Sequence, residues 1–341
     1  MNNRLGYIDA IRGFAMLIVV YGHVNFFSFK ITPFIGTITG AIQMPLFFFI
    51  SGCLVYKANS QCSIKSSCLK LWDKFKMLIV PAMVMGVLYS YLMLRKSPLD
   101  FVMEHMKYGY WFPISLFSMY VVYELCKVIC QNKIKFLLPL LILVSIVMWL
   151  LKYILIDDIE ILNDIFVLWQ TFTYQPFFVL GVILCVYRER YEYCVSINGF
   201  FNTILLVLFV LSMSFSNSAE ALNIKFPVGG VLSLIIGSSA SLLLLNFFIK
   251  HKSYFNESFV GRSLQTIGRR TLEIYLLHYF LLPDLTYATK YVDTSSTIVG
   301  LAINIVISIL IIIVSLMIGN VIRLSPVLAS FLLGVKYKKQ S

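Results

Sequence analysis

The sequence predicts an all-α fold, a polytopic bundle of about ten helices that cross a membrane. Of its 341 residues, 59% are hydrophobic and only 13% are charged, and the mean hydropathy is +0.85. An ordinary globular chain carries about 25% charged residues, so this chain cannot cover a water-soluble surface. Apolar runs of about 20 residues, the length that crosses the hydrocarbon core of a bilayer, recur from one end to the other.

These runs predict ten spans, at roughly 8–29, 34–55, 77–94, 111–131, 136–156, 165–187, 198–216, 227–249, 267–283 and 297–323. No stretch between them is long enough for a soluble domain, so residues 1–341 are expected to form a single membrane domain with no appended soluble domain. The first run is longer than the apolar part of a signal peptide, and no small-residue cleavage site follows it. We therefore interpret it as the first permanent helix.

The basic residues predict how the spans are oriented. If the amino terminus is cytoplasmic and ten spans alternate, 21 of the 28 Lys and Arg residues fall on the cytoplasmic side. Basic residues concentrate in the cytoplasmic loops of membrane proteins, so both termini are expected in the cytoplasm. The net charge of +12 then reflects topology and contact with anionic membrane lipids. It gives no reason to expect a nucleic-acid partner.

The seven cysteines point to the same topology. All of them fall in predicted cytoplasmic loops or at cytoplasmic helix ends, and a reducing compartment suits free thiols. No cysteine spacing resembles a zinc site, and the chain has only four His residues. We therefore predict no disulfide and no metal.

The first predicted helix carries ionisable residues that a membrane span needs a reason to contain. Arg12 and His23 are eleven residues apart, which places them about 20° apart around an α-helix and about 16 Å apart along it. Asp9 lies within about 40° of the same line. A neutral imidazole at the deeper position of His23 can act as a general base. The spacing alone equally permits an Asp9–Arg12 pair that packs helices and a His23 that is hydrogen-bonded within the bundle.

Four later segments also stand out, namely Pro45–Gly52, the stretch with Lys74, Lys76 and Pro81, Tyr110–Pro113, and Gly268–His278. Together with the Asp, Arg-Gly and His of the first helix, they resemble the motifs of membrane acyltransferase family 3, in the same order. This family includes many bacterial O-acetyltransferases. The resemblance covers essentially the whole chain and is specific as a set, although the family more often has arginine where this chain has Lys74 and Lys76.

The resemblance implies an acyltransferase of the bacterial inner membrane that modifies a hydroxyl group. Its donor would be acetyl-coenzyme A, with no permanently bound cofactor, and its acceptor a surface polysaccharide or a lipid-linked sugar precursor. His23 would take the proton from the acceptor hydroxyl as a general base. Arg12 would bind a donor phosphate or orient the site through Asp9. Direct transfer and a transient acetyl-His23 are both open.

The other candidate residues have a functional and a structural interpretation each. Four basic residues are candidates for binding the donor phosphates, and orientation in the membrane explains them about equally well: Lys74, Lys76, Arg269 and Arg270. Four more are candidates for acceptor binding: Ser51, Trp111, Glu273 and His278. Close helix packing also explains Ser51, and the aromatic belt of a membrane interface also explains Trp111.

Glu273 and His278 share one predicted helix but not one face. Five residues separate them, which places their side chains about 140° apart. Glu273 is expected either to pair with a basic group or to line the cavity. A structural role is the better interpretation of His278.

A transporter or flippase for a sugar-lipid is the alternative class, because it would also be polytopic with buried polar groups. The chain shows no internal repeat, no paired halves and no matched broken helices of the kind transporters often have. A passive assembly subunit would leave Arg12 and His23 without a role. Acyl transfer is therefore the preferred hypothesis.

Overall fold

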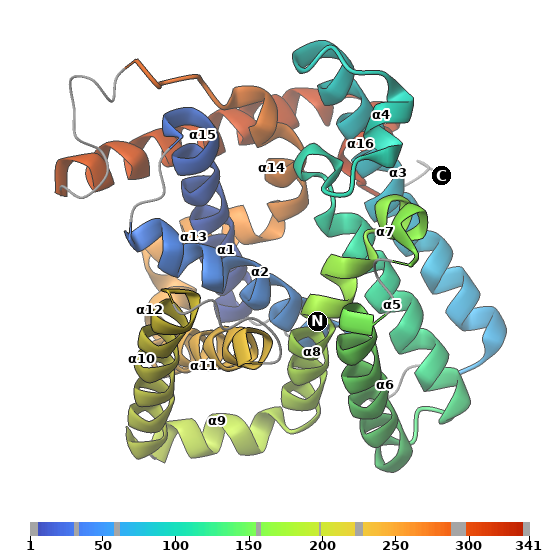
Figure 1. Ribbon diagram of the computed structural model, residues 1–341, viewed down its shortest axis with the longest axis vertical. Helices are drawn as coiled ribbons and strands as arrows, with labels where there is room; N and C mark the ends of the chain where they lie inside the picture. Colours follow the sequence, from blue (N-terminus) through green and yellow to red (C-terminus); the bar gives the residue numbers. More distant parts are fainter. Residues whose placement is uncertain are drawn as a thin grey trace. The chain divides into compact units, whose positions relative to one another are not determined.

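The structure is a computed structural model that describes residues 6–30, 34–57, 62–154, 158–197, 199–221, 228–287 and 298–336. Every regular element in these ranges is helical, which confirms the all-α prediction (Figure 1). The elements are α1 (Gly6–His23), η1 (Val24–Phe29), α2 (Phe34–Val55), α3 (Ile64–Met93), α4 (Pro98–Met103), η2 (Lys107–Gly109), α5 (Phe112–Ile129), α6 (Ile134–Ile154), α7 (Glu160–Phe166), α8 (Leu168–Val186), α9 (Arg188–Ile197), α10 (Gly199–Ala221), α11 (Val228–Lys250), α12 (Lys252–Glu257), α13 (Phe259–Arg269), α14 (Thr271–Leu277), η3 (His278–Leu281), α15 (Ile298–Ile322) and α16 (Pro326–Leu333).

Nine helices in the described ranges are long and apolar enough to cross a membrane, and they match nine of the predicted spans. The predicted span at 267–283 is instead broken, because α13 ends at Arg269 and α14 is followed by the short 3-10 helix η3. Between Arg270 and Pro283 the apolar stretch is shorter than the roughly 20 residues that a single span needs. The cytoplasmic placement of both termini stays a prediction.

The helix α3 begins well before its predicted start at residue 77. Ser63 caps it, with its side chain accepting a hydrogen bond of 3.1 Å from the backbone N–H of Ser66. The turns that follow are too polar to register as an apolar run, but they contain neither Gly nor Pro and continue the helix. Lys74 and Lys76 therefore lie within a helix rather than in a loop.

The chain forms two compact units. The first contains residues 1–54, 180–271 and 282–312, and the second contains residues 55–179, 272–281 and 313–341. The helices α8, α14 and α15 contribute residues to both. The single membrane domain expected from the sequence stays a prediction.

In the first unit, α1 packs directly along α13 (Figure 1). Two glycines make this close approach possible. A methyl group at Gly13 would overlap the carbonyl oxygen of Leu264, and a methyl group at Gly268 would overlap the carbonyl oxygen of Asp9. Small residues of this kind let helix backbones approach closely within membranes. Gly13, which follows Arg12, and Gly268, which precedes Arg269, thus place the arginine-bearing segments of α1 and α13 side by side.

In the second unit, a tyrosine cluster holds the segment that precedes α5. Tyr275 and Tyr279 both donate hydrogen bonds to the carbonyl oxygen of Gly109, whose φ of 101° suits glycine alone. Tyr110 donates in return to the carbonyl oxygen of Leu276 at 2.9 Å. Burial raises the pKa of Tyr110 well above its ordinary value, so its hydroxyl stays protonated and able to donate.

Candidate active site

The helix α1 carries all three residues that the sequence analysis places at the centre of the chemistry. It is α-helical from Gly6 to His23, so the eleven-residue spacing of Arg12 and His23 lies on one regular helix. Their side chains are therefore on nearly the same face, with Arg12 three turns before His23. Asp9 and Arg12 occupy the first half of the helix, and His23 is its last residue.

Arg12 has partners on two elements of the first unit. Its Nη1 lies 3.7 Å from Oδ1 of Asp9, and its Nη2 donates to Oγ1 of Thr271 at 3.0 Å. The side chain of Asp9 is 6% exposed, while that of Arg12 is 25% exposed. The guanidinium is thus held at a fixed place next to the start of α14 and still reaches the surface of the unit.

Arg269 and Arg270 belong to this same neighbourhood. They close α13 directly after Gly268, whose backbone touches α1, and they precede Thr271, the partner of Arg12. Arg269 is exposed and donates to the hydroxyl of Thr266 at 3.2 Å. Arg270 is half-buried. The structure therefore brings Arg12 and the arginine pair together within one unit.

His23 lies where α1 changes its geometry. The chain continues from it into η1, a π-helix of six residues, and π-helical turns occur often at functional sites. The imidazole is half-buried and meets the ring of Phe27 edge-on, with the ring centroids 5.6 Å apart. No feature of the sequence pattern marked this change of helix type.

Lys74 and Lys76, the other proposed donor-binding residues, lie on α3 in the second unit. The ammonium group of Lys74 sits 4.2 Å from the ring centroid of Tyr120, a cation–π contact. Lys76 pairs with Asp73 at 3.2 Å, and Asp73 also binds Lys336 at 2.8 Å. Only Lys74 faces α5, whereas the charge of Lys76 is shared with a carboxylate.

A cluster of buried polar side chains lies between α3 and α5, and the predictions from the sequence did not include it. Ser67 donates to Glu124 at 2.6 Å, and Lys127 lies 3.3 Å from the same carboxylate. Glu124 is 7% exposed and Lys127 is 1% exposed. Two ionisable residues in one apolar span are costly without a partner, so a count of charges within the predicted span 111–131 would have found them.

The proposed acceptor-binding residues Glu273 and His278 are already engaged in the second unit. Glu273 is 3% exposed and accepts hydrogen bonds from both Nε and Nη2 of Arg323. His278 is fully buried, and its Nδ1 lies 2.8 Å from the carbonyl oxygen of Tyr275. These contacts fit the structural interpretations of both residues.

Ser51 and Trp111 lie in different units. In the first unit, Ser51 is half-buried on α2 and donates to the carbonyl oxygen of Phe47 at 2.8 Å. In the second, Trp111 is 7% exposed and stacks on Tyr174, with ring centroids 5.6 Å apart. The Ser51 contact fits the packing interpretation, whereas the Trp111 contact is aromatic stacking within the second unit.

A family model described as an acyltransferase domain matches residues 5–319. The chain belongs to acyltransferase family 3. The match spans all five motifs and confirms the resemblance seen in the sequence. With its nine membrane-length helices in the described residues, the protein is a multi-pass membrane acyltransferase. No curated protein and no solved structure matches the chain.

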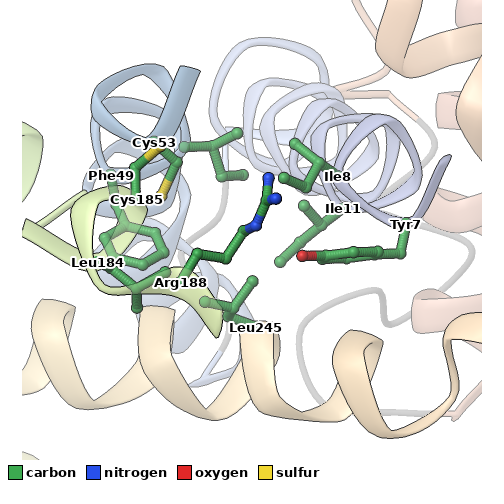
Figure 2. A pocket seen from close by; sticks show the side chains of 10 residues that line it. Tyr7, Ile8, Ile11, Phe49, Cys53, Leu184, Cys185, Arg188 and Leu245 are labelled. Atoms are coloured by element: carbon green, nitrogen blue, oxygen red, sulfur yellow. The ribbon is translucent and has the colours of Figure 1, made fainter. Parts of the chain in front are cut away.

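The acyltransferase also has a pocket in its first unit that the sequence did not indicate. Figure 2 shows the guanidinium of Arg188 entering a mostly apolar space beside Cys53, Cys185 and Ile8. Its Nε lies 3.7 Å from Glu192. In the sequence, Arg188 is one of the 21 basic residues that the predicted topology places on the cytoplasmic side.

The described residues contain no group of three His, Cys, Asp or Glu side chains that could hold a metal ion. All seven cysteines are free thiols. Asp9, Arg12 and His23 give α1 a carboxylate, a guanidinium and an imidazole. An imidazole can move a proton, and a guanidinium can bind phosphate or carboxylate oxygens.

Proposed function

We propose that this acyltransferase moves an acetyl group from acetyl-coenzyme A to a hydroxyl of a carbohydrate in a bacterial inner membrane. The acceptor is a surface polysaccharide or its lipid-linked sugar precursor. The observation that carries the proposal is the arrangement on α1, where a half-buried His23 and an anchored Arg12 share one face. The carbohydrate class follows from the family resemblance.

His23 acts as the general base in the proposed reaction. The acceptor oxygen attacks the thioester carbonyl carbon while its proton passes to the imidazole. The tetrahedral intermediate then expels the sulfur of coenzyme A, and the imidazolium returns the proton to that sulfur. The products are an acetyl ester and a free thiol. Transfer through acetyl-His23 would instead take two steps. The imidazole would first accept the acetyl group from the thioester and then pass it to the acceptor hydroxyl.

Basic side chains bind the donor phosphates in this proposal. In the first unit, Arg12 lies beside the arginine pair Arg269–Arg270, and a planar guanidinium suits phosphate oxygens. In the second unit, Lys74 is the better candidate, because Asp73 competes for Lys76. Positive-inside topology supports a cytoplasmic position for these residues, where acetyl-coenzyme A is made.

Candidates for acceptor binding are Ser51 in the first unit and Trp111 in the second, and Glu273 and His278 are candidates for a supporting role within the second unit. The stacked rings of Trp111 and Tyr174 offer an aromatic face of the kind that packs under sugar rings. The Arg323 partner of Glu273 and the complete burial of His278 favour a supporting role over direct contact with the acceptor.

Release of free thiol from acetyl-coenzyme A by the purified protein tests this function. The probe is the surface glycan fraction of the host cell, added to protein in detergent micelles, with the His23→Gln variant as the matched control. Acceptor-dependent thiol release, together with a glycan mass gain of one acetyl group, is the expected result. Sugar-lipid movement across proteoliposomes without thiol release would instead support the flippase alternative.

A further inference from the structure

The segment directly after His23 has an unusual backbone. The helix α1 is regular up to His23, and the next six residues form the π-helix η1, which ends at Lys30 with a φ of 55°. A π-helical turn is rare in proteins and needs support from its surroundings. The contacts around η1 show what supplies that support in the first unit.

A buried pair of asparagines anchors the start of η1. Oδ1 of Asn25 accepts a hydrogen bond from Nδ2 of Asn304, and the two residues are 4% and 2% exposed. Ser308 donates to the carbonyl oxygen of Asn304 at 2.7 Å and lies 3.2 Å from its Oδ1. Since its Oδ1 is bound by Ser308, Asn304 presents its Nδ2 to Asn25.

The helix that supplies Asn304 is the most apolar of the candidate spans in the described residues. The most apolar 18-residue window of α15 has a mean hydropathy of 3.0. An asparagine in such a helix is costly unless it hydrogen-bonds within the bundle. The hydrogen bond to Asn25 therefore lowers this cost and at the same time ties α15 to the turn that follows His23.

The end of η1 is anchored separately. The backbone N–H of Leu285 donates to the carbonyl oxygen of Ser28 at 2.9 Å. The ammonium group of Lys30 lies 3.5 Å from Asp284. Both ends of the π-helix are thus tied to segments far away in the sequence.

The residue before His23 is held from another side. Gly22 lies against Gln43 of α2, and a methyl group added at Gly22 would come within 2.9 Å of Oε1 of Gln43. His23 is therefore preceded by Gly22, which lies against the side chain of Gln43, and followed by a π-helical turn that is anchored at both ends.

We propose that Asn25 and Asn304 are positioning residues for His23. Their hydrogen bond maintains the π-helical turn, and that turn sets the direction of the imidazole toward the acceptor hydroxyl. The inference rests on the proposed role of His23 as general base. It assigns to α15 a function in catalysis that acts through His23 rather than through contact with the reacting atoms.

Helix packing alone does not account for this cluster. Nδ2 of Asn25 and Oγ of Ser28 are buried, and neither has a hydrogen-bond partner among the described residues. Unpaired buried polar atoms lower stability, whereas an apolar pair of similar size would be neutral or better. A cluster that served packing only would be improved by leucine, and this difference can be tested.

The decisive protein is the double variant Asn25→Leu/Asn304→Leu. It removes both partners at once, so it leaves neither amide unpaired and should insert and fold at least as well as the wild type. Ser315→Ala, a buried position on the same helix, is the matched control and should keep its activity. We expect the double variant to lose about 100-fold in kcat, the cost of a misplaced catalytic group, with an unchanged KM for acetyl-coenzyme A.

A double-mutant cycle with His23→Gln distinguishes a positioning role of Asn304 from a general loss of stability. In the His23→Gln background, adding Asn304→Leu should cause no further loss, because the pair acts through the imidazole. With His23 present, Asn304→Leu should move the acid limb of the pH profile of kcat/KM as well as lowering the rate. Asn304→Gln, which keeps an amide donor, should recover part of the activity.

Three results would overturn the inference. They are a wild-type rate in the double leucine variant, an equal loss from Asn304→Leu in the wild-type and His23→Gln backgrounds, and a lower rate with an unmoved pH limb. A wild-type rate in His23→Gln alone has a different meaning, because it would remove the proposed function on which the inference rests.

Discussion

His23 and His278 are both histidines of motif-bearing apolar segments, and the structure separates them. His23 is half-buried at the end of α1, next to an anchored π-helix. His278 is fully buried, and its Nδ1 lies 2.8 Å from the carbonyl oxygen of Tyr275 in the preceding helix α14. A base must reach the proton it takes. Access, rather than membership of a motif, therefore distinguishes the candidate base from the packing residue.

The same contrast holds for two arginines, Arg12 on α1 and Arg323 directly after α15. Arg12 meets a hydroxyl, that of Thr271, and lies 3.7 Å from Asp9. Arg323 binds both carboxylate oxygens of Glu273. A guanidinium that closes on a carboxylate in this bidentate way forms a structural pair. The α1 site thus resembles a place for a ligand, whereas the Glu273 site resembles a completed contact.

The largest expected effect comes from glutamine at each histidine. His23→Gln keeps polarity but cannot take the proton, so acetyl transfer should fall by about 10²–10⁴-fold, with donor binding retained. His278→Gln should keep its rate per folded molecule and lose about 1–3 kcal/mol of stability, because a buried hydrogen bond is disturbed. Initial rates at saturating acetyl-coenzyme A, and thermal unfolding, measure the two effects. Equal rate losses in both variants would contradict the distinction between His23 as the base and His278 as a packing residue.

Arginine-to-lysine changes should have the next largest effect. Arg12→Lys keeps the charge but loses the planar fork, and a lost hydrogen bond to a charged group, about 1.5–3 kcal/mol, corresponds to roughly 10–100-fold in rate. The protein should still insert. Arg323→Lys is the matched control and should mainly lower stability. Near-normal turnover of Arg12→Lys would show that the charge alone, or neither feature, matters at this position.

The smallest expected effect concerns how α1 is held. Gly268→Ala should destabilise the protein by about 1–3 kcal/mol, because the methyl group overlaps the backbone of α1. Gly40→Ala on α2 has nothing within 4 Å of the added methyl group, so it should be neutral or up to about 1 kcal/mol stabilising. Thermal unfolding of both variants makes the comparison. Equal melting temperatures in the two variants would mean that α1 and α13 accommodate the methyl group without a loss of stability.

Hydropathy predicted most of the helices, and the structure differs from the predicted spans in two informative places. It missed the early turns of α3, which are polar yet helical, and it joined α13, α14 and η3 into one span. A hydropathy window measures only whether about 20 residues can cross a bilayer. It is blind to a helix that extends beyond the apolar region and to a break at a charged pair such as Arg269–Arg270.

The candidate site was predicted to a similar degree. Spacing alone predicted that Asp9, Arg12 and His23 lie near one face of a helix, and the three residues do lie on one continuous helix. Their roles stay predictions. The asparagine pair Asn25–Asn304 was not found, because its members are far apart in the sequence and neither belongs to a motif.

The sequence by itself determined the membrane class, nine of the helices and the common face of Arg12 and His23. These properties depend on hydrophobicity and helical period, which are local. Only the tertiary structure decided that Arg323 binds Glu273, that His278 is fully buried, and that Asn304 donates a hydrogen bond to Asn25 in the turn after His23. Which side chains become partners depends on which helices approach closely. Close approach depends in turn on residues that are far apart in the sequence, such as Gly13 and Gly268, where the backbones of two helices meet.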